Sequence, residues 1–222
     1  MSLILPWHLQ LFVLRITFMA TMNAYLHAEI SVKKRGGKIE DYLPIHDFMD
    51  STKELCSDNR HRILHTMWGI KRVIVPIFGH SFQNSSGKIV NVKDLCEQDH
   101  ILPDYRNRFI PTLSDFTAAI SAQDDDLQKI SAFYNDYKDD KEISELLISP
   151  LNNTGHIKSL LITHNSWFIN EIIPRIFKRN IQLQPFSITP ADLFNRMNFE
   201  LWMDNGFEYP ASAQKTKSIF SN

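Results

Sequence analysis

The chain has 222 residues, a formal net charge of −1 and 43% hydrophobic residues. This length accommodates one or two domains with a sizeable core, and the balanced charge gives no global field that would attract nucleic acid or a membrane. Two cysteines fit neither a disulfide framework nor a zinc knuckle, so we expect a reducing compartment and a cytoplasmic protein. The nine histidines are a high count.

The first 22 residues form an apolar segment. Its run of apolar residues is interrupted by His8, Gln10 and Arg15, and an arginine at mid-membrane costs roughly 2.5–3.5 kcal/mol. Arg15 also comes too late for the basic start of a signal peptide. We expect residues 1–22 to be peripheral or to precede the true start. A membrane-associated helix over residues 2–20 is the alternative.

Histidines and a carboxylate recur at one-turn spacing in one short stretch. His46 is followed by Asp50, and His61 by His65, and residues four apart on a helix share a face. The short polar break 57–59 between the pairs favours an antiparallel hairpin of two helices. In such a hairpin Asp50 and His65 lie equally far from the break. We therefore predict that these four side chains converge.

The boundaries of these two helices follow from local signals. Asp41 is the predicted N-cap of the first helix, and Pro44 is tolerated in its first turn. The second helix is predicted from about Asn59 to Val75, with Pro76 ending it.

The chemistry of this cluster suggests a metal site. Neutral imidazoles with a carboxylate suit zinc, manganese or iron, and a bound ion would activate water. A metal-dependent hydrolase or phosphohydrolase is therefore the first hypothesis. The predicted ligands are His46, Asp50, His61 and His65, with His27 or His100 completing the shell. Glu97 or Asp99 would be the general base, and Lys53 or Arg62 would hold a leaving anion.

Two other interpretations stay open. In a non-enzymatic binding module, the same residues form a structural polar network and the C-terminal helices form the surface for a protein partner. Nucleic-acid binding through the basic loop 33–38 is weaker, because the net charge is near zero. The dipeptide His46-Asp47 is also found in histidine–aspartate phosphohydrolases, but alone it is a weak signal.

Periodicity predicts a mainly α-helical fold with a minor β-hairpin, a helix pair carrying the His/Asp cluster and a C-terminal helical unit. Alternation around 84–87 places the hairpin near Ser81 to Val92. We predict four segments: 1–22, a His-rich domain over 23–123, a helical region over 124–208 and a flexible tail over 209–222. The later helices are predicted at Leu127 to Tyr137, Glu142 to Ile148, Ile157 to Phe177 and Pro190 to Met203.

Several short motifs recur together between about residues 23 and 116. They include Gly36-Gly37, Asp41-Tyr42, Arg60-His61-Arg62, Phe78-Gly79 and Ile110-Pro111-Thr112, with His27, Ile45-His46, Asp50, Lys53, His65, Gly69, Asn84, Gly87, Glu97 and His100. This set resembles a small uncharacterised domain family of bacteria and phages. The resemblance implies a domain and no activity. Asp99 is inserted before His100 relative to the family pattern, which leaves the role of His100 open.

Overall fold

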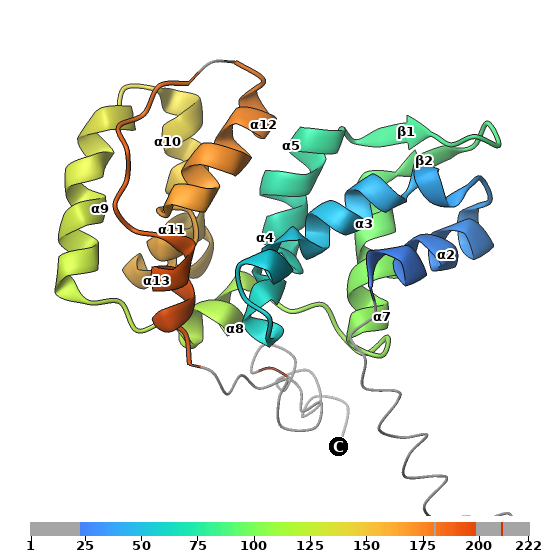
Figure 1. Cartoon of the computed structure of the whole chain (residues 1–222), viewed down its shortest axis with the longest axis horizontal. Coiled ribbons are helices and arrows are strands. Elements are labelled where there is room, and N and C mark those ends of the chain that lie inside the picture. Colours follow the sequence, from blue (N-terminus) through green and yellow to red (C-terminus); the bar gives the residue numbers. More distant parts are fainter. Residues whose placement is uncertain (1–22, 180, 199–209, 211–222) are drawn as a thin grey trace, which may run out of the picture.

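The computed structural model describes residues 23–179, 181–198 and 210, and these form a mainly helical fold with a two-stranded hairpin (Figure 1). The predicted fold class is confirmed. The apolar N-terminal segment and, apart from Pro210, the predicted tail lie outside the described residues. Among the residues that are described, no helix has the length and apolar character needed to cross a membrane.

The first half of the fold consists of short helices with a β-hairpin at one edge (Figure 1). Its helical elements are α2 (Ala24–Arg35), α3 (Leu43–Asp50), α4 (Met67–Gly69), α5 (Val75–Phe78), α6 (Val92–Leu95) and α7 (Leu102–Asp104), with 3₁₀ turns at Ile39–Asp41, Ser51–Glu54 and Asn59–Leu64 and π-turns at Ile70–Ile74 and Cys96–Ile101. Strand β1 (Ser81–Gln83) pairs antiparallel with β2 (Ile89–Asn91), where the hairpin was predicted.

The named elements of the second half are all helical among the residues that the structure describes. Its elements are α8 (Leu113–Ala118), α9 (Asp124–Tyr137), α10 (Lys141–Leu147), α11 (Ser149–Thr154), a 3₁₀ helix (Ile157–Ile162), a π-turn (Phe168–Ile172), α12 (Ile173–Phe177) and α13 (Pro190–Asn195). Thr189 caps α13 and Pro190 occupies its first turn. The helix predicted over Ile157 to Phe177 is interrupted, because a turn at 163–165 separates the 3₁₀ helix from α12.

Asp41 is not the N-cap of α3, which begins after Tyr42. Its carboxylate instead accepts hydrogen bonds from the backbone N–H of Lys38 at 2.7 Å and of Ser85 at 3.0 Å. Asp41 therefore closes the preceding 3₁₀ turn and ties it to the hairpin loop.

The helix predicted over residues 59–75 is also corrected. It is divided near His65, where the backbone leaves the helical region, and a new helix starts at Met67. Pro76 does not end this helix, which continues through α5 to Phe78. The reason is the π-turn just before it: the N–H of Val75 bonds to the carbonyl five residues back, not four.

Each described π-turn lies directly upstream of a proline. Pro76, Pro103 and Pro174 follow the turns that end at 74, 101 and 172. Proline lacks an N–H and clashes with the carbonyl four residues back, and a π-turn holds one residue more than an α-turn. The inserted Asp99 lies within the second of these turns, so the helix absorbs the insertion and continues.

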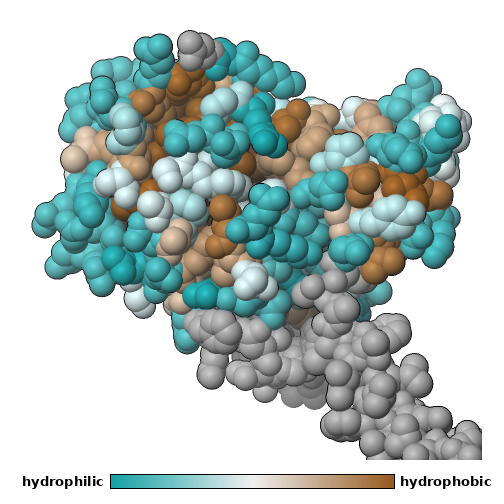
Figure 2. All heavy atoms as spheres, in the orientation of Figure 1, coloured by the Kyte–Doolittle hydropathy of each residue, from teal (hydrophilic) through white to brown (hydrophobic). Residues whose placement is uncertain are grey.

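A single hydrophobic cluster, with members from Ala28 to Met197, runs through both halves. Trp68 donates to Ser149 Oγ at 2.9 Å, and Arg60 donates to the carbonyl of Phe194 at 2.6 Å. Helices α5 and α12 lie side by side where the halves meet (Figure 1). Hydrophilic residues cover most of the face in Figure 2. The predicted division near residue 124 stays a prediction.

Candidate metal centre

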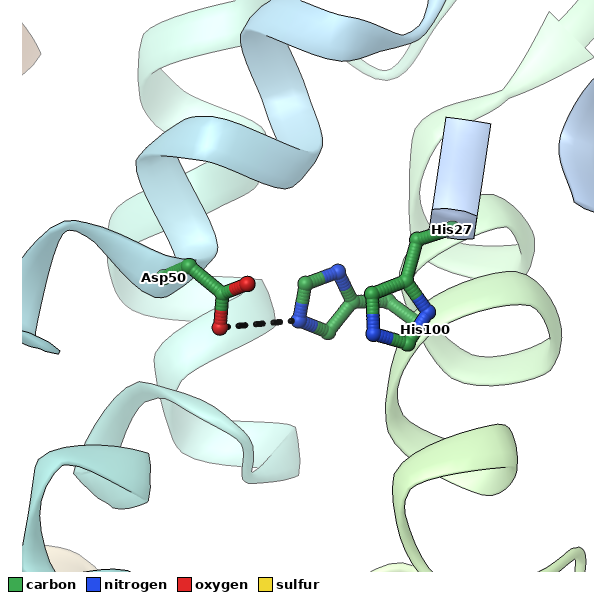
Figure 3. Close-up of side chains that lie close together, drawn as sticks. All are labelled: His27, Asp50 and His100. Carbon is green, nitrogen blue, oxygen red and sulfur yellow. Dashed lines mark ion pairs between the residues drawn. The ribbon is translucent and has the colours of Figure 1, made fainter. Parts of the chain in front are cut away.

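Three helical segments bring His27, Asp50 and His100 together inside the first half of the molecule (Figure 3). His27 comes from α2, Asp50 from the end of α3, and His100 from the π-turn after α6. The imidazole rings of His27 and His100 stack with their centroids 3.9 Å apart. Asp50 Oδ1 lies 3.6 Å from His100 Nε2. All three residues are buried, so burial and proximity together define a candidate ligand group.

His65 and Asp104 also lie close to His100. His65 Nδ1 lies 3.1 Å from Asp104 Oδ2, and His27 Nε2 lies 3.2 Å from Asp104 Oδ1. Both His100–Asp50–His27 and His100–Asp104–His65 have ligand atoms within 4.8 Å of one another. Of the two nitrogens of His100, Nε2 is the one near both carboxylates, at 3.6 Å from Asp50 Oδ1 and 4.0 Å from Asp104 Oδ2. Because one imidazole nitrogen binds one ion, the two groups form a single site.

The outward contacts of two imidazoles fix where their protons lie. His27 Nδ1 is 2.9 Å from the carbonyl oxygen of Asp99, and His65 Nε2 is 3.2 Å from that of Met49. A carbonyl only accepts, so each of these nitrogens carries the hydrogen. In the neutral form, the other nitrogen of each ring therefore presents a lone pair to Asp104.

A chain of hydrogen bonds from Ser31 through His46 indicates which nitrogen of His100 carries the hydrogen. When the Ser31 hydroxyl donates to the carbonyl of His27, at 3.2 Å, its Oγ accepts from His46 Nε2 at 2.9 Å, and a hydroxyl turned toward His46 would reverse the chain. His46 Nδ1 then accepts from His100 Nδ1, also at 2.9 Å. In the neutral form this assignment leaves His100 Nε2 with a lone pair directed at Asp50 and Asp104.

The centre therefore directs three nitrogen lone pairs at two carboxylates. Within it, His27 Nε2, His65 Nδ1, His100 Nε2, Asp50 Oδ1 and Asp104 Oδ1 are buried and make no hydrogen bond. Lone pairs facing carboxylates repel one another unless a cation lies between them. A proton on an imidazole or a shared metal ion would each remove this repulsion.

The electrostatics favour a neutral His100 and ionised carboxylates. Burial, followed by the nearby imidazole of His27, lowers the pKa of His100 to about 3. Burial alone would raise the pKa of Asp104, but hydrogen bonds donated by His27 and His65, followed by the charge of Arg62, outweigh it and hold that pKa well below its usual range. For Asp50, hydrogen bonds donated by His100 and Lys53 likewise outweigh burial and lower the pKa. These shifts describe imidazoles that carry a proton toward the carboxylates, and a metal ion would take the place of that proton. At neutral pH His100 is therefore neutral, so a proton on His100 does not offset the charge of the two carboxylates.

Two predicted ligands lie just outside the centre. His46 has both ring nitrogens bonded, to Ser31 and to His100, so it orients a ligand and does not face the carboxylates. His61 donates from Nδ1 to the carbonyl of Asp58, and its ring meets that of His65 edge-on at 5.9 Å. Burial, then His65, lowers the pKa of His61 to about 4.

The predicted general bases do not face the cluster. Glu97 pairs with Lys93 at 2.9 Å, and Asp99 pairs with Lys34 at 3.0 Å and with Arg35. The two pairs of Asp99 also engage part of the basic loop 33–38, for which the sequence suggested nucleic-acid binding. Asp47, the partner in the His-Asp dipeptide, is exposed. Lys53 does reach the site, with Nζ 2.8 Å from Asp50 Oδ2.

Sequence reasoning missed Asp104. This residue contacts His27 and His65 and lies four residues after His100. That spacing repeats the one between His46 and Asp50, so the same i, i+4 rule would have identified it. Arg62 Nε lies 3.9 Å from Asp104 Oδ2 and supplies a buried positive charge beside the site.

Comparison with known proteins adds a family and no activity. No curated protein and no solved structure matches the chain. The match is to a family model described as "Domain of unknown function (DUF6915)", and it covers residues 22–125. All residues of the candidate metal centre lie within this range, so the part of the chain that carries the centre is similar to an uncharacterised domain family, in keeping with the resemblance seen in its sequence.

Proposed function

We propose that this protein binds one divalent transition metal ion, zinc, manganese or iron, and uses it for hydrolysis. The ligands are the imidazoles of His27, His65 and His100 with the carboxylates of Asp50 and Asp104. Three nitrogens and two carboxylates are a donor set that these ions accept. The single observation that carries the proposal is the direction of the three lone pairs, each set by a hydrogen bond on the far side of its ring.

Hydrolysis is the reaction that such an ion supports. A bound divalent ion lowers the pKa of its water, which then attacks an electrophilic centre as hydroxide. Asp50 is the more exposed of the two carboxylates, at 8% against 2% for the side chain of Asp104. One oxygen of Asp50 would bind the ion and the other would accept the proton of that water, in place of Glu97 and Asp99.

A structural polar network is the second candidate, and one observation favours it. Each carboxylate already has a cationic neighbour, Lys53 beside Asp50 and Arg62 beside Asp104. In this case the histidines stabilise the packing of the helices, and the domain is a non-enzymatic interaction module, with the C-terminal helices as the surface for a protein partner. No metal would then contribute to stability.

Thermal melting with and without EDTA separates the two candidates. A metal that binds only the folded chain raises the melting temperature, so EDTA should lower it and added zinc or manganese should restore it. His65→Ala should abolish this response. His164→Ala removes an equally buried histidine of the other half, and His156→Ala an exposed one, and both should keep it. A parent protein that melts identically in all conditions would exclude the metal.

A further inference from the structure

The side chains at the candidate centre differ in how much of them is exposed to solvent. The side chains of His27, His65 and His100 are fully buried, and that of Asp104 is 2% exposed. Exposure rises to 8% at Asp50 and 30% at Lys53. Lys53 is thus the most exposed of these side chains, so the edge formed by Asp50 and Lys53 is the place where a ligand from solvent can approach the centre.

The charges at the centre sum to zero before an ion binds. Asp50 and Asp104 supply two negative charges, and Lys53 and Arg62 lie 2.8 and 3.9 Å from them with two positive charges. The side chain of Arg62 is 7% exposed, and its Nε makes no hydrogen bond. A divalent ion bound by neutral imidazoles would leave a net charge of +2 in a largely desolvated place, which is costly unless an anion offsets it.

We propose that the metal-loaded centre binds the phosphate group of a phosphate monoester at the edge formed by Asp50 and Lys53. This inference rests on the proposed metal site. A phosphate monoester carries close to two negative charges at neutral pH, which matches the net charge of +2 at the metal-loaded centre. A carboxylate carries only one negative charge. One phosphate oxygen binds the ion, and the ammonium of Lys53 pairs with another as a point charge. The chain would thus act on small phosphorylated molecules.

The test is calorimetric titration of inorganic phosphate into the full chain, first metal-free and then loaded with zinc or manganese and dialysed. Loaded protein should bind phosphate, and metal-free protein should not. Acetate should bind at least about tenfold more weakly than phosphate, in keeping with its single charge. Equal binding of acetate, or no phosphate binding by loaded protein, would overturn the proposal.

Variants of Lys53 test the position of the anion. Lys53→Met should weaken phosphate binding by about tenfold or more, as expected for loss of a charge-assisted contact, and Lys53→Arg should largely restore it. Lys129→Met is the matched control, because Lys129 also pairs with a nearby aspartate, at 2.7 Å from Asp125, but in the other half. An unchanged affinity in Lys53→Met would refute the proposal. Metal content is measured in the same samples, so a chain that binds metal but not phosphate refutes this inference alone.

Discussion

Ser31 is linked to the ring of the ligand His100 only through His46, and its hydroxyl still influences which nitrogen of His100 carries the proton. When that hydroxyl donates to the carbonyl of His27, it accepts from His46. His46 in turn accepts from His100, which leaves the Nε2 of His100 free of a proton. Hydrogen bonds on the far side of a ligand ring commonly set its tautomer and orientation in this way.

Ser31→Ala should therefore weaken metal binding without removing a ligand. The loss expected for a partner of this kind is about 10–100-fold in affinity. Ser159→Ala is the control, because Ser159 is equally buried and bonds a carbonyl in the other half. Competition of each variant with a chromophoric chelator for zinc measures the effect. Equal affinities in the two variants would contradict the hydrogen-bonded chain.

Asp104→Asn and Asp99→Asn should differ in their effects on metal binding and on the melting temperature. Asp104→Asn removes a ligand charge and should abolish stoichiometric metal binding. Asp99→Asn breaks ion pairs with Lys34 and Arg35, so it should lower the melting temperature and leave metal binding intact. Elemental analysis and melting curves of both proteins decide between the profiles. Loss of metal in Asp99→Asn alone would contradict the assignment of Asp104, and not Asp99, as a ligand.

Part of the centre could be predicted from spacing and part could not. The i, i+4 spacing places Asp50 near the cluster and would also have identified Asp104. The role of His46 depends on a hydroxyl 15 residues away. That of His27 depends on a carbonyl 72 residues away. Spacing along one helix carries no information about such long-range contacts.

Among the elements, the helix from Val92 to Asp104 shapes the centre through its proline. Pro103 has no N–H to give to the carbonyl of Asp99, four residues earlier. That carbonyl instead accepts from His27 Nδ1 at 2.9 Å. The π-turn that precedes Pro103 thus places His100 and also exposes the acceptor that orients His27.

Pro103→Ala should weaken metal binding several-fold without destabilising the fold. The new N–H can bond the carbonyl of Asp99 and compete with His27, while alanine favours the helix by about 3 kcal/mol over proline. Pro174→Ala makes the same change after the π-turn of α12 and should leave metal binding unchanged. Chelator competition and melting curves test both variants. Weaker binding in both would show that the effect is not local.

For the whole molecule, periodicity predicted the helical class and the hairpin, because these depend on local pattern. It misplaced the boundary at Pro76, since a proline signal does not reveal a π-turn that accommodates it. The contacts that join the halves, such as Trp68 with Ser149, pair residues distant in the chain. A single sequence does not show which of them meet.

The stability of the whole fold should fall in acid, in part through His164. Tyr137 and the carbonyl of Leu160 bond its two nitrogens, and burial lowers its pKa to about 4. The unfolded chain has a histidine pKa near 6.5. Between these values the unfolded state binds the proton and the folded state does not. The free energy of unfolding therefore decreases as pH falls from about 6.5 to about 4, by at most about 1.4 kcal/mol per pH unit for this residue.

Urea unfolding across this pH range measures the contribution. His164→Gln should show a shallower decrease than the parent, because glutamine does not titrate. His156→Gln is the control, since His156 is exposed, and its curve should be parallel to that of the parent. Parallel curves for the parent and His164→Gln would contradict the assignment.

The most direct test of the central claim is the metal-to-chain ratio after dialysis against zinc or manganese and removal of free ion. Elemental analysis of the parent should give close to one ion per chain. His27→Ala, His65→Ala and His100→Ala should each lose it, and His164→Ala should retain it. A parent chain that holds neither ion, or variants that all hold it equally, would contradict the metal centre.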